Sequence, residues 1–203
     1  MANVIKNHEM FPTVANEFNY VADKNLINAI ENQELVTKHN PSLSQASVNN
    51  TLHKEKEFEG ITKKILETTK EVCDFYGYLY ESIEITNLWI NLSKKNCSHS
   101  PHTHSNNVFS GVWFPFENIS ETPIVFQDPR PAANVLQPKL KNDLNKYNSS
   151  LMLFQPNKNF GLIFPSWLMH YVPLTIKNRI SMSWNVLLRG EYGEPNTLQN
   201  ASI

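Results

Sequence analysis

The sequence predicts an α+β protein that is mainly β, with helices early in the chain and short strands after residue 83. Apolar residues recur at intervals of three, four and seven between residues 58 and 79, which is the spacing of one helix face. From residue 83 onward, short runs rich in apolar residues are separated by Pro, Asn and Gly, without helical spacing between them. Strands in this arrangement form antiparallel sandwiches or barrels, so we expect such a core with the helices on one outer sheet face.

The length of 203 residues favours a single domain spanning residues 1–203. Within it, residues 1–82 are expected to form an N-terminal arm and supporting helices, and residues 83–190 the β core. Residues 10–20 look extended, and Asp23 is placed to cap a helix over residues 24–33. Its inward side chains would be Leu26, Ile27 and Ile30. The polar residues 36–53 predict a loop or wrapping arm.

A second and longer helix is the clearest helical pattern in the chain. Thr68 and Thr69 fill the one gap in its apolar face, and Gly77 marks its fraying end. The apolar face is made of Phe58, Ile61, Ile65, Val72, Tyr76 and Leu79. We expect this helix to pack on a flat surface rather than to carry chemistry.

The strand-rich half begins with ITNLWINLS, in which apolar and polar side chains alternate. Further strands are predicted in residues 108–116, 123–127, 150–156, 161–165 and 179–188. The long polar segment 128–148 interrupts them, and long loops on β scaffolds are either binding lids or simply mobile.

The composition excludes several classes of function. The formal net charge of −1 gives no basic field for nucleic acid, and no apolar run is long enough to span a membrane. The N-terminal residues lack the apolar region of a secretory signal. Cys73 and Cys97 are not a close pair in sequence and are expected to stay reduced, so we expect a cytoplasmic protein.

Three histidines in SHSPHTH point to a metal. His102 and His104 are two residues apart, so in an extended chain they point to the same side, about 6.5–7 Å apart at Cα. First-row metals accept imidazole nitrogen, and His170, the only other histidine in the strand-rich half, is the natural third ligand. His99 precedes Ser-Pro and is interpreted as an ordinary loop residue.

The last long strand, RISMSWNVLL, has one apolar and one polar face. The polar face carries Arg179, Ser181, Ser183 and Asn185, and it points either to solvent or into a cavity. In a cavity, Arg179 would offer a fork of donors to a carboxylate, and Ser181 would add a hydroxyl bond.

Together these motifs resemble the Fe(II)/2-oxoglutarate-dependent oxygenases, and more narrowly a small family with an H-x-H motif found in marine bacteria and phages. The resemblance rests on NLWINL, HTHSNNVFSGVWF, PIVFQDPR, GLIFPSWLMHYV and NRISMSWNV, in this order, over about half the chain. It implies a double-stranded β-helix, or jelly roll. It also implies His102 and His170 as iron ligands, and Arg179 and Ser181 as the anchor of the distal carboxylate of 2-oxoglutarate.

One position departs from the wider superfamily. Its usual motif is H-x-D or H-x-E, whereas this chain has His104 in place of the carboxylate. Three neutral imidazoles leave more positive charge on the metal than a carboxylate would, which leaves open a halide or water as a further ligand, or a different metal. The narrower family also shows H-x-H, so the motif does not indicate an inactive enzyme.

The resemblance implies a hydroxylase that uses Fe(II), with 2-oxoglutarate as cosubstrate and succinate and carbon dioxide as products. Its substrate is unknown, either a small molecule or a peptide, and its oligomeric state is open. Trp89, Asn91, Trp113 and Asn185 are candidate pocket residues; Trp89, Trp113 and also Phe126 are equally compatible with plain core positions. Two alternatives remain: a three-histidine cupin-type metalloenzyme that does not use 2-oxoglutarate, and a non-catalytic jelly roll with a binding or structural role.

Overall fold

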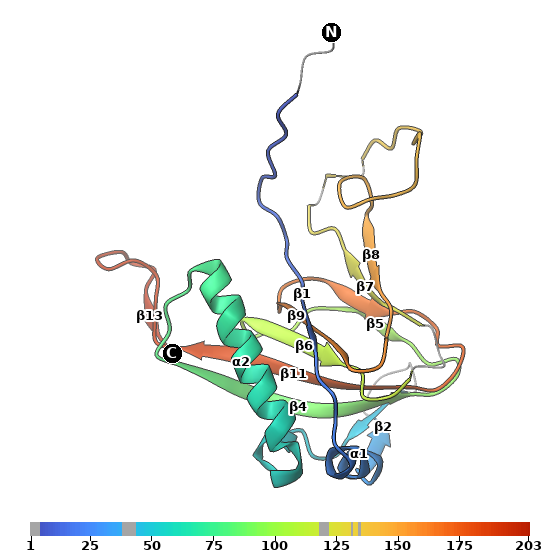
Figure 1. The fold of residues 1–203 in the computed structure, drawn as a ribbon. Coiled ribbons are helices and arrows are strands. Elements are labelled where there is room, and N and C mark those ends of the chain that lie inside the picture. The colour runs from blue at the N-terminus through green and yellow to red at the C-terminus, as the bar shows by residue number, and fades with distance from the viewer. Residues whose placement is uncertain (1–4, 38–43, 118–121, 131, 134) are drawn as a thin grey trace.

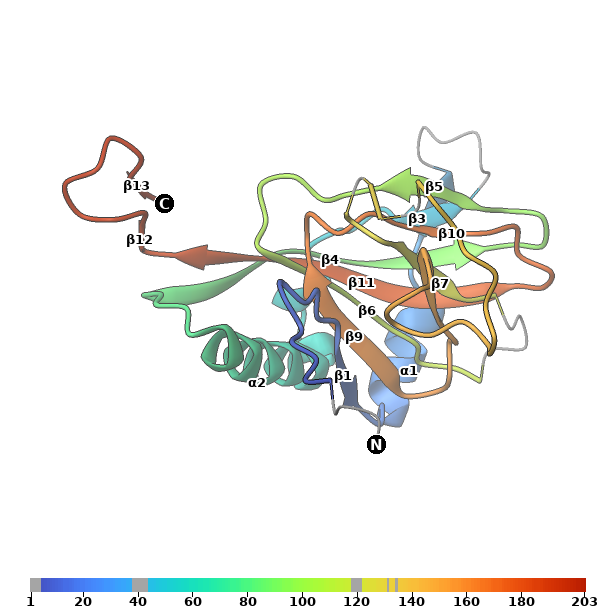
Figure 2. The same cartoon turned by 90° about the horizontal axis from the view of Figure 1, so that it is seen from above.

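Two β-sheets face each other in the computed structural model, which describes residues 5–37, 44–117, 122–130, 132–133 and 135–203. Figures 1 and 2 show the larger sheet in the middle, with the helices on one side of it and the smaller sheet on the other. This mainly β arrangement, with helices on one outer face, confirms the fold expected from the sequence.

The larger sheet has seven strands, and its longest pair forms the centre of the molecule. That pair is β4 (Ser82–Ser93) and β11 (Arg179–Arg189), which run antiparallel along almost their whole length. In spatial order, the sheet consists of β1 (Asn16–Asn19), β9 (Phe160–Pro165), β6 (Phe109–Trp113), β11, β4, β3 (Gln45–Ser47) and β2 (Leu35–Thr37). β2 and β3 correct the expectation of a loop over residues 36–53, of which residues 38–43 lie outside the described part.

The smaller sheet has four strands and carries the histidines. Its order is β5 (His99–His102), β10 (His170–Val172), β7 (Ile124–Gln127) and β8 (Leu151–Phe154). β5 corrects the interpretation of His99 as a loop residue. Pro101 lies within β5, and a proline is tolerated there because β5 is an edge strand. A short hairpin near the C-terminus, β12 (Glu191–Tyr192) and β13 (Ala201–Ser202), completes the strands.

The helices begin and end largely where the sequence indicates. The Asp23 side chain accepts a hydrogen bond from the Leu26 backbone N–H (2.8 Å), which caps α1 (Lys24–Glu31). Two short 3₁₀ turns (Leu52–Lys54 and Lys56–Phe58) lead into α2 (Glu59–Tyr76). None of the described helices is long and apolar enough to cross a bilayer.

The end of α2 corrects one expected core position. Gly77 has a φ of 67°, the left-handed conformation that terminates helices. The helical phase is lost there, so Leu79 is 95% exposed instead of packing on the sheet. Thr68 and Thr69 are buried and fill the gap in the apolar face, as expected.

Two apolar clusters lie on opposite faces of the larger sheet. The outer cluster joins α2 to residues such as Trp113 and Trp184. The inner cluster lies between the sheets, where Phe126 of β7 packs on Phe164 of β9 with their ring centroids 4.8 Å apart. The rest of the inner space is lined by polar side chains, which are described below.

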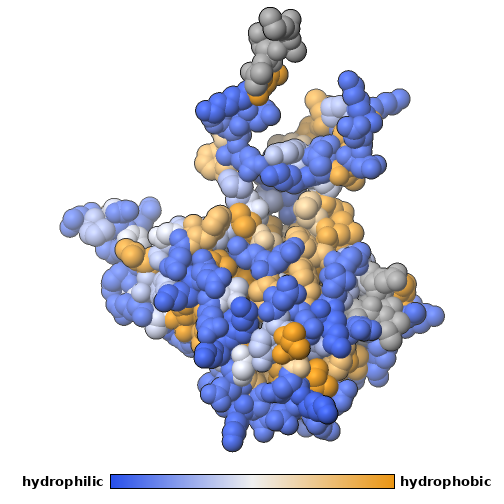
Figure 3. Space-filling view, in the orientation of Figure 1, coloured by the Kyte–Doolittle hydropathy of each residue, from blue (hydrophilic) through white to orange (hydrophobic). Residues whose placement is uncertain are grey.

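Residues 128–148 project from the body and, where described, form no helix or strand (Figure 1). Glu9 of the N-terminal segment accepts hydrogen bonds from Lys146 Nζ (2.6 Å) and the Tyr147 hydroxyl (2.7 Å). Figure 3 shows apolar side chains gathered on the body below these projecting segments. A lid role for residues 128–148 stays a prediction.

Candidate metal and cosubstrate site

The structure brings His102, His104 and His170 together on the inner side of the smaller sheet. Each histidine offers one ring nitrogen, and the three nitrogens lie within 4.8 Å of one another. The Nε2 atoms of His104 and His170 are 3.3 Å apart. Two nitrogens bound to one zinc-type ion at about 2.1 Å would be separated by roughly 3.0–3.4 Å. Small side-chain rotations would therefore let the three rings bind a single metal ion.

Strand pairing and one backbone bond hold these rings in place. His170 pairs directly with His102 between β10 and β5. His104 follows the end of β5, and its backbone N–H donates to the Ser166 carbonyl at 2.9 Å, which ties it to the turn before β10. The H-x-H spacing and the distant third histidine thus meet because two neighbouring strands carry them.

Backbone carbonyls determine which nitrogen faces the site. His170 Nδ1–H donates to the Leu168 carbonyl (2.9 Å), and His102 Nδ1–H donates to the Ser100 carbonyl (2.7 Å). A carbonyl can only accept, so in the neutral form of each ring the Nε2 lone pair is the one available to a metal.

Burial keeps two of the three rings neutral. Desolvation lowers the pKa of His170 to about 3 and that of His104 to about 4. A neutral imidazole is the form that binds a metal, so no proton has to be displaced near neutral pH. The donor set therefore fits a first-row metal ion such as Fe(II).

Arg179 is the second unusual feature of the inner face. It is only 2% exposed, its guanidinium lies 4.9 Å above the Phe114 ring, and its Nη1 donates to Ser181 Oγ at 3.3 Å. Its Nε has no hydrogen-bond partner among the described residues, and none of their carboxylates forms an ion pair with it. Desolvation lowers its pKa to about 10, so it remains charged at neutral pH. A buried, unpaired guanidinium suits a carboxylate ligand, which 2-oxoglutarate has at its distal end.

The other expected pocket residues divide between the two faces. Trp89 lies near His104, with ring centroids 6.2 Å apart, and its indole N–H donates to Asn91 Oδ1 at 3.0 Å. Asn185 Oδ1 accepts from the Ser110 hydroxyl at 2.8 Å, also on the inner side. Trp113 is different: it is fully buried in the outer cluster under the helices, so its expected place in the pocket is wrong.

Sequence reasoning missed one residue of this region, His99. Its Nε2 lies 3.3 Å from the hydroxyl of Ser93, which is fully buried at the end of β4. Desolvation, with a smaller effect of the Arg179 charge, lowers the pKa of His99 to about 4. The signal was a third histidine three residues before the H-x-H pair, hidden by the adjacent Ser-Pro.

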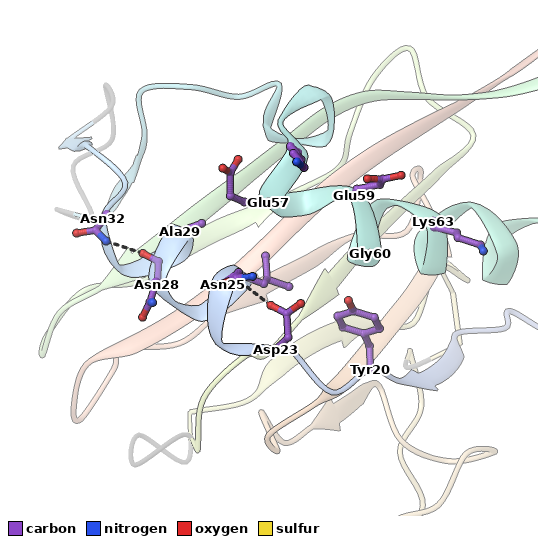
Figure 4. Close-up of a pocket in the computed structure, with 12 residues that line it drawn as sticks. Tyr20, Asp23, Asn25, Asn28, Ala29, Asn32, Glu57, Glu59, Gly60 and Lys63 are labelled. Atoms are coloured by element: carbon purple, nitrogen blue, oxygen red, sulfur yellow. Dashed lines mark hydrogen bonds between the residues drawn. The ribbon is translucent and has the colours of Figure 1, made fainter.

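A separate hollow of about 710 Å³ lies between α1 and the beginning of α2. Figure 4 shows its polar lining, which includes Tyr20, Asp23, Glu59 and Lys63. It lies on the helix side of the larger sheet, and none of the candidate metal or carboxylate-binding residues lines it.

Comparison with solved structures shows the same fold. An oxidoreductase of the 2OG-Fe(II) oxygenase family from Burkholderia pseudomallei has a TM-score of 0.57 at 15% identity, covering 79% of this chain and 75% of that chain. A prolyl-4-hydroxylase from Pseudomonas putida has a TM-score of 0.56 at 9% identity, covering 87% and 94%. HygX from Streptomyces hygroscopicus, solved with nickel, 2-oxoglutarate and hygromycin B, has a TM-score of 0.56 at 8% identity, covering 87% and 83%.

The sequence itself is similar to one protein family. No curated protein is detectably similar to the chain. The model of the family described as "Putative 2OG-Fe(II) oxygenase" matches residues 87–185, a stretch that runs from β4 through β11 and contains the three histidines and Arg179. This match covers 99 of the 203 residues, just under half of the chain; over this stretch the chain is similar to the 2OG-Fe(II) oxygenase family, and its three histidines could hold a metal ion.

Proposed function

We propose that the chain is a hydroxylase in which His102, His104 and His170 bind Fe(II), while Arg179 and Ser181 hold the distal carboxylate of 2-oxoglutarate. The observation that carries the proposal is the buried Arg179, which has no carboxylate partner among the described residues and lies on the inner face of the larger sheet, opposite the smaller sheet that carries the histidine cluster. The substrate would be a small molecule or a peptide. Two free cysteines, both buried, support a cytoplasmic location.

The residues of the chain would bind, orient and exclude water. His102 and His170 would present Nε2 to the metal because backbone carbonyls hold their Nδ1–H groups. Arg179 would neutralise the far end of the cosubstrate and fix its direction. The inner cluster around Phe126 and Phe164 would keep water from the metal side of His170, against which both rings pack. Dioxygen would be the oxidant, and bound Fe(II) with 2-oxoglutarate would supply the chemistry that activates it: one oxygen atom would enter the substrate and the other would end in succinate, with release of carbon dioxide.

Metal titration tests the ligand set. His102→Ala, His104→Ala and His170→Ala should each weaken Fe(II) or Co(II) binding, measured anaerobically by calorimetry. His53→Ala is the control, because His53 lies in the 3₁₀ turn before α2, outside the histidine cluster. Tight binding retained by both His102→Ala and His170→Ala would rule out the three-ligand model.

Cosubstrate titration tests the anchor. Arg179→Ala in the metal-loaded protein should raise the 2-oxoglutarate dissociation constant by roughly 10- to 100-fold, the loss of charge-assisted hydrogen bonds. Arg179→Lys should recover only part of the 2-oxoglutarate affinity, because an ammonium lacks the planar fork of donors that a guanidinium has. Metal affinity should not change, and unchanged 2-oxoglutarate affinity would contradict the proposal. A screen for succinate release over candidate substrates would then identify the reaction.

One observation favours a second candidate, a three-histidine metalloenzyme that does not use 2-oxoglutarate. The third metal-binding position is His104, not a carboxylate. The two candidates differ in one measurement, because only the oxygenase would bind 2-oxoglutarate through Arg179.

A further inference from the structure

His99 bridges the two sheets at the position of Arg179. Its Nε2 lies 3.3 Å from Ser93 Oγ, and Ser93 is the residue that pairs directly with Arg179 between β4 and β11. His99 belongs to the smaller sheet, whereas Ser93 and Arg179 belong to the larger one. This contact therefore joins the sheets beside the buried guanidinium.

Among the residues that the structure describes, the polar groups around Ser93 are donors and neutral acceptors, and no carboxylate is hydrogen-bonded to them. The Ser44 hydroxyl lies 3.3 Å from Ser93 Oγ and also within 3.4 Å of the Ser98 carbonyl. Ser93 is fully buried and His99 is partly so, which makes an ordinary solvated surface role unsuitable for this cluster. A buried cation flanked by hydroxyls and a neutral ring suits an anionic group that accepts several hydrogen bonds at once.

We infer that His99 and Ser93 are positioning residues for the distal carboxylate of 2-oxoglutarate, an inference that rests on the proposed function. His99 Nε2–H donates to Ser93 Oγ and holds it in place. The Ser93 hydroxyl then turns its own proton to the carboxylate that Arg179 and Ser181 bind. His99 acts only through Ser93 and touches no reacting atom.

This arrangement makes the site selective for the distal carboxylate, and a pair of ligands tests that selectivity. The ligands are 2-oxoglutarate and 2-oxopentanoate, which has the same five-carbon chain without the distal carboxylate. In the Co(II)-loaded protein, His99→Ala should raise the dissociation constant of 2-oxoglutarate about 2- to 10-fold, the loss of one neutral hydrogen bond to Ser93. Ser93→Ala should raise it roughly 10- to 100-fold, because the Ser93 hydroxyl donates to the carboxylate itself. Binding of 2-oxopentanoate and of Co(II) should stay unchanged.

A conservative variant separates positioning from packing. His99→Gln keeps an amide N–H that can reach Ser93, so it should recover most of the 2-oxoglutarate affinity, whereas His99→Ala should not. His53→Ala serves as the control for replacing a half-buried histidine elsewhere. Should His99→Ala fail to fold, Ser93→Ala with the same two ligands decides the question.

The outcomes distinguish this inference from the proposed function. Unchanged 2-oxoglutarate affinity in His99→Ala and Ser93→Ala, together with a loss in Arg179→Ala, overturns the inference and leaves the proposed function standing. An equal loss for both ligands also overturns it, because it indicates a general structural role. If the unmodified metal-loaded protein binds no 2-oxoglutarate, the proposed function itself fails.

Discussion

The two faces of β11 bury different kinds of side chain, apolar on one face and polar on the other. On the outer face, Met182 and Trp184 are fully buried in an apolar cluster against the helices. On the inner face, Arg179 and Ser181 are buried just as deeply but are polar. Burial of apolar area on the outer face stabilises the fold, whereas burial of a charge on the inner face costs free energy.

This difference shows how the fold separates stability from chemistry. A strand covered on both faces need not be apolar on both, provided that one face is lined by polar groups with a function. The outer face should therefore respond to substitution with large losses of stability, and the inner face with losses of binding. Four experiments test this separation of stability from chemistry.

Trp184→Ala should give the largest effect. Its ring fills the space between β11, β6 and Phe18, and truncating a fully buried tryptophan removes about 3–5 kcal/mol from the free energy of unfolding. Urea denaturation followed by circular dichroism measures the loss. Metal affinity of the fraction that remains folded should be retained. A loss below about 1 kcal/mol would show that the outer cluster does not carry the fold.

The ionisation of the Cys73 thiol tests how tightly the outer face is packed. Desolvation raises the pKa of its thiol from 9.0 to about 11 in the folded protein. A folded pKa above the unfolded one means that this contribution to stability is present below about pH 9 and is lost as pH rises towards 11. At pH 9 the folded protein should hold about 50-fold less Cys73 thiolate than the unfolded chain. Iodoacetamide labelling with and without urea measures this, and rapid labelling of folded Cys73 would contradict tight packing of the outer cluster.

Gly111→Ala should cost less but still clearly destabilise. A Cβ at this position would clash with the Trp184 ring and approach the Leu162 carbonyl oxygen to 2.8 Å. Overpacking of this kind costs roughly 1–3 kcal/mol, and backbone atoms on one side cannot give way. The measurement is again the urea midpoint, and an unchanged midpoint would contradict the packing described here. Gly111, between Ser110 and Val112, thus leaves room on the outer face for the Trp184 ring.

The alternation of apolar and polar side chains let the sequence predict both long strands and most of the candidate site. β4 and β11 are long enough for the period of two to be plain, so the inward direction of Arg179 and Ser181 could be expected once a cavity was assumed. The meeting of His102 with His170 needed the pairing of β5 with β10, which no local pattern encodes.

The errors have physical causes that belong to particular residues. VFSGVWF is apolar on both faces of β6, so its sequence does not indicate that Trp113 points to the helices. β2 and β3 have three residues each, too few to show alternation. Pro101 hid β5 and therefore the role of its first residue, His99, because a proline normally indicates a loop.

Arg179→Met should have the smallest effect on stability, within about 1 kcal/mol of zero or in the stabilising direction. The guanidinium is buried without an ion pair among the described residues, so its desolvation is not offset, and a methionine of similar length would pack on the Phe114 ring. Arg189→Met, at the exposed end of the same strand, loses a solvent-screened pair with Glu84 and should also change little. Urea denaturation of the metal-free proteins compares the two. Only Arg179→Met should lose 2-oxoglutarate affinity.

A loss of stability in Arg179→Met as large as that of Trp184→Ala would mean that the inner face stabilises the fold as well. The separation of stability from chemistry on β11 would then be wrong.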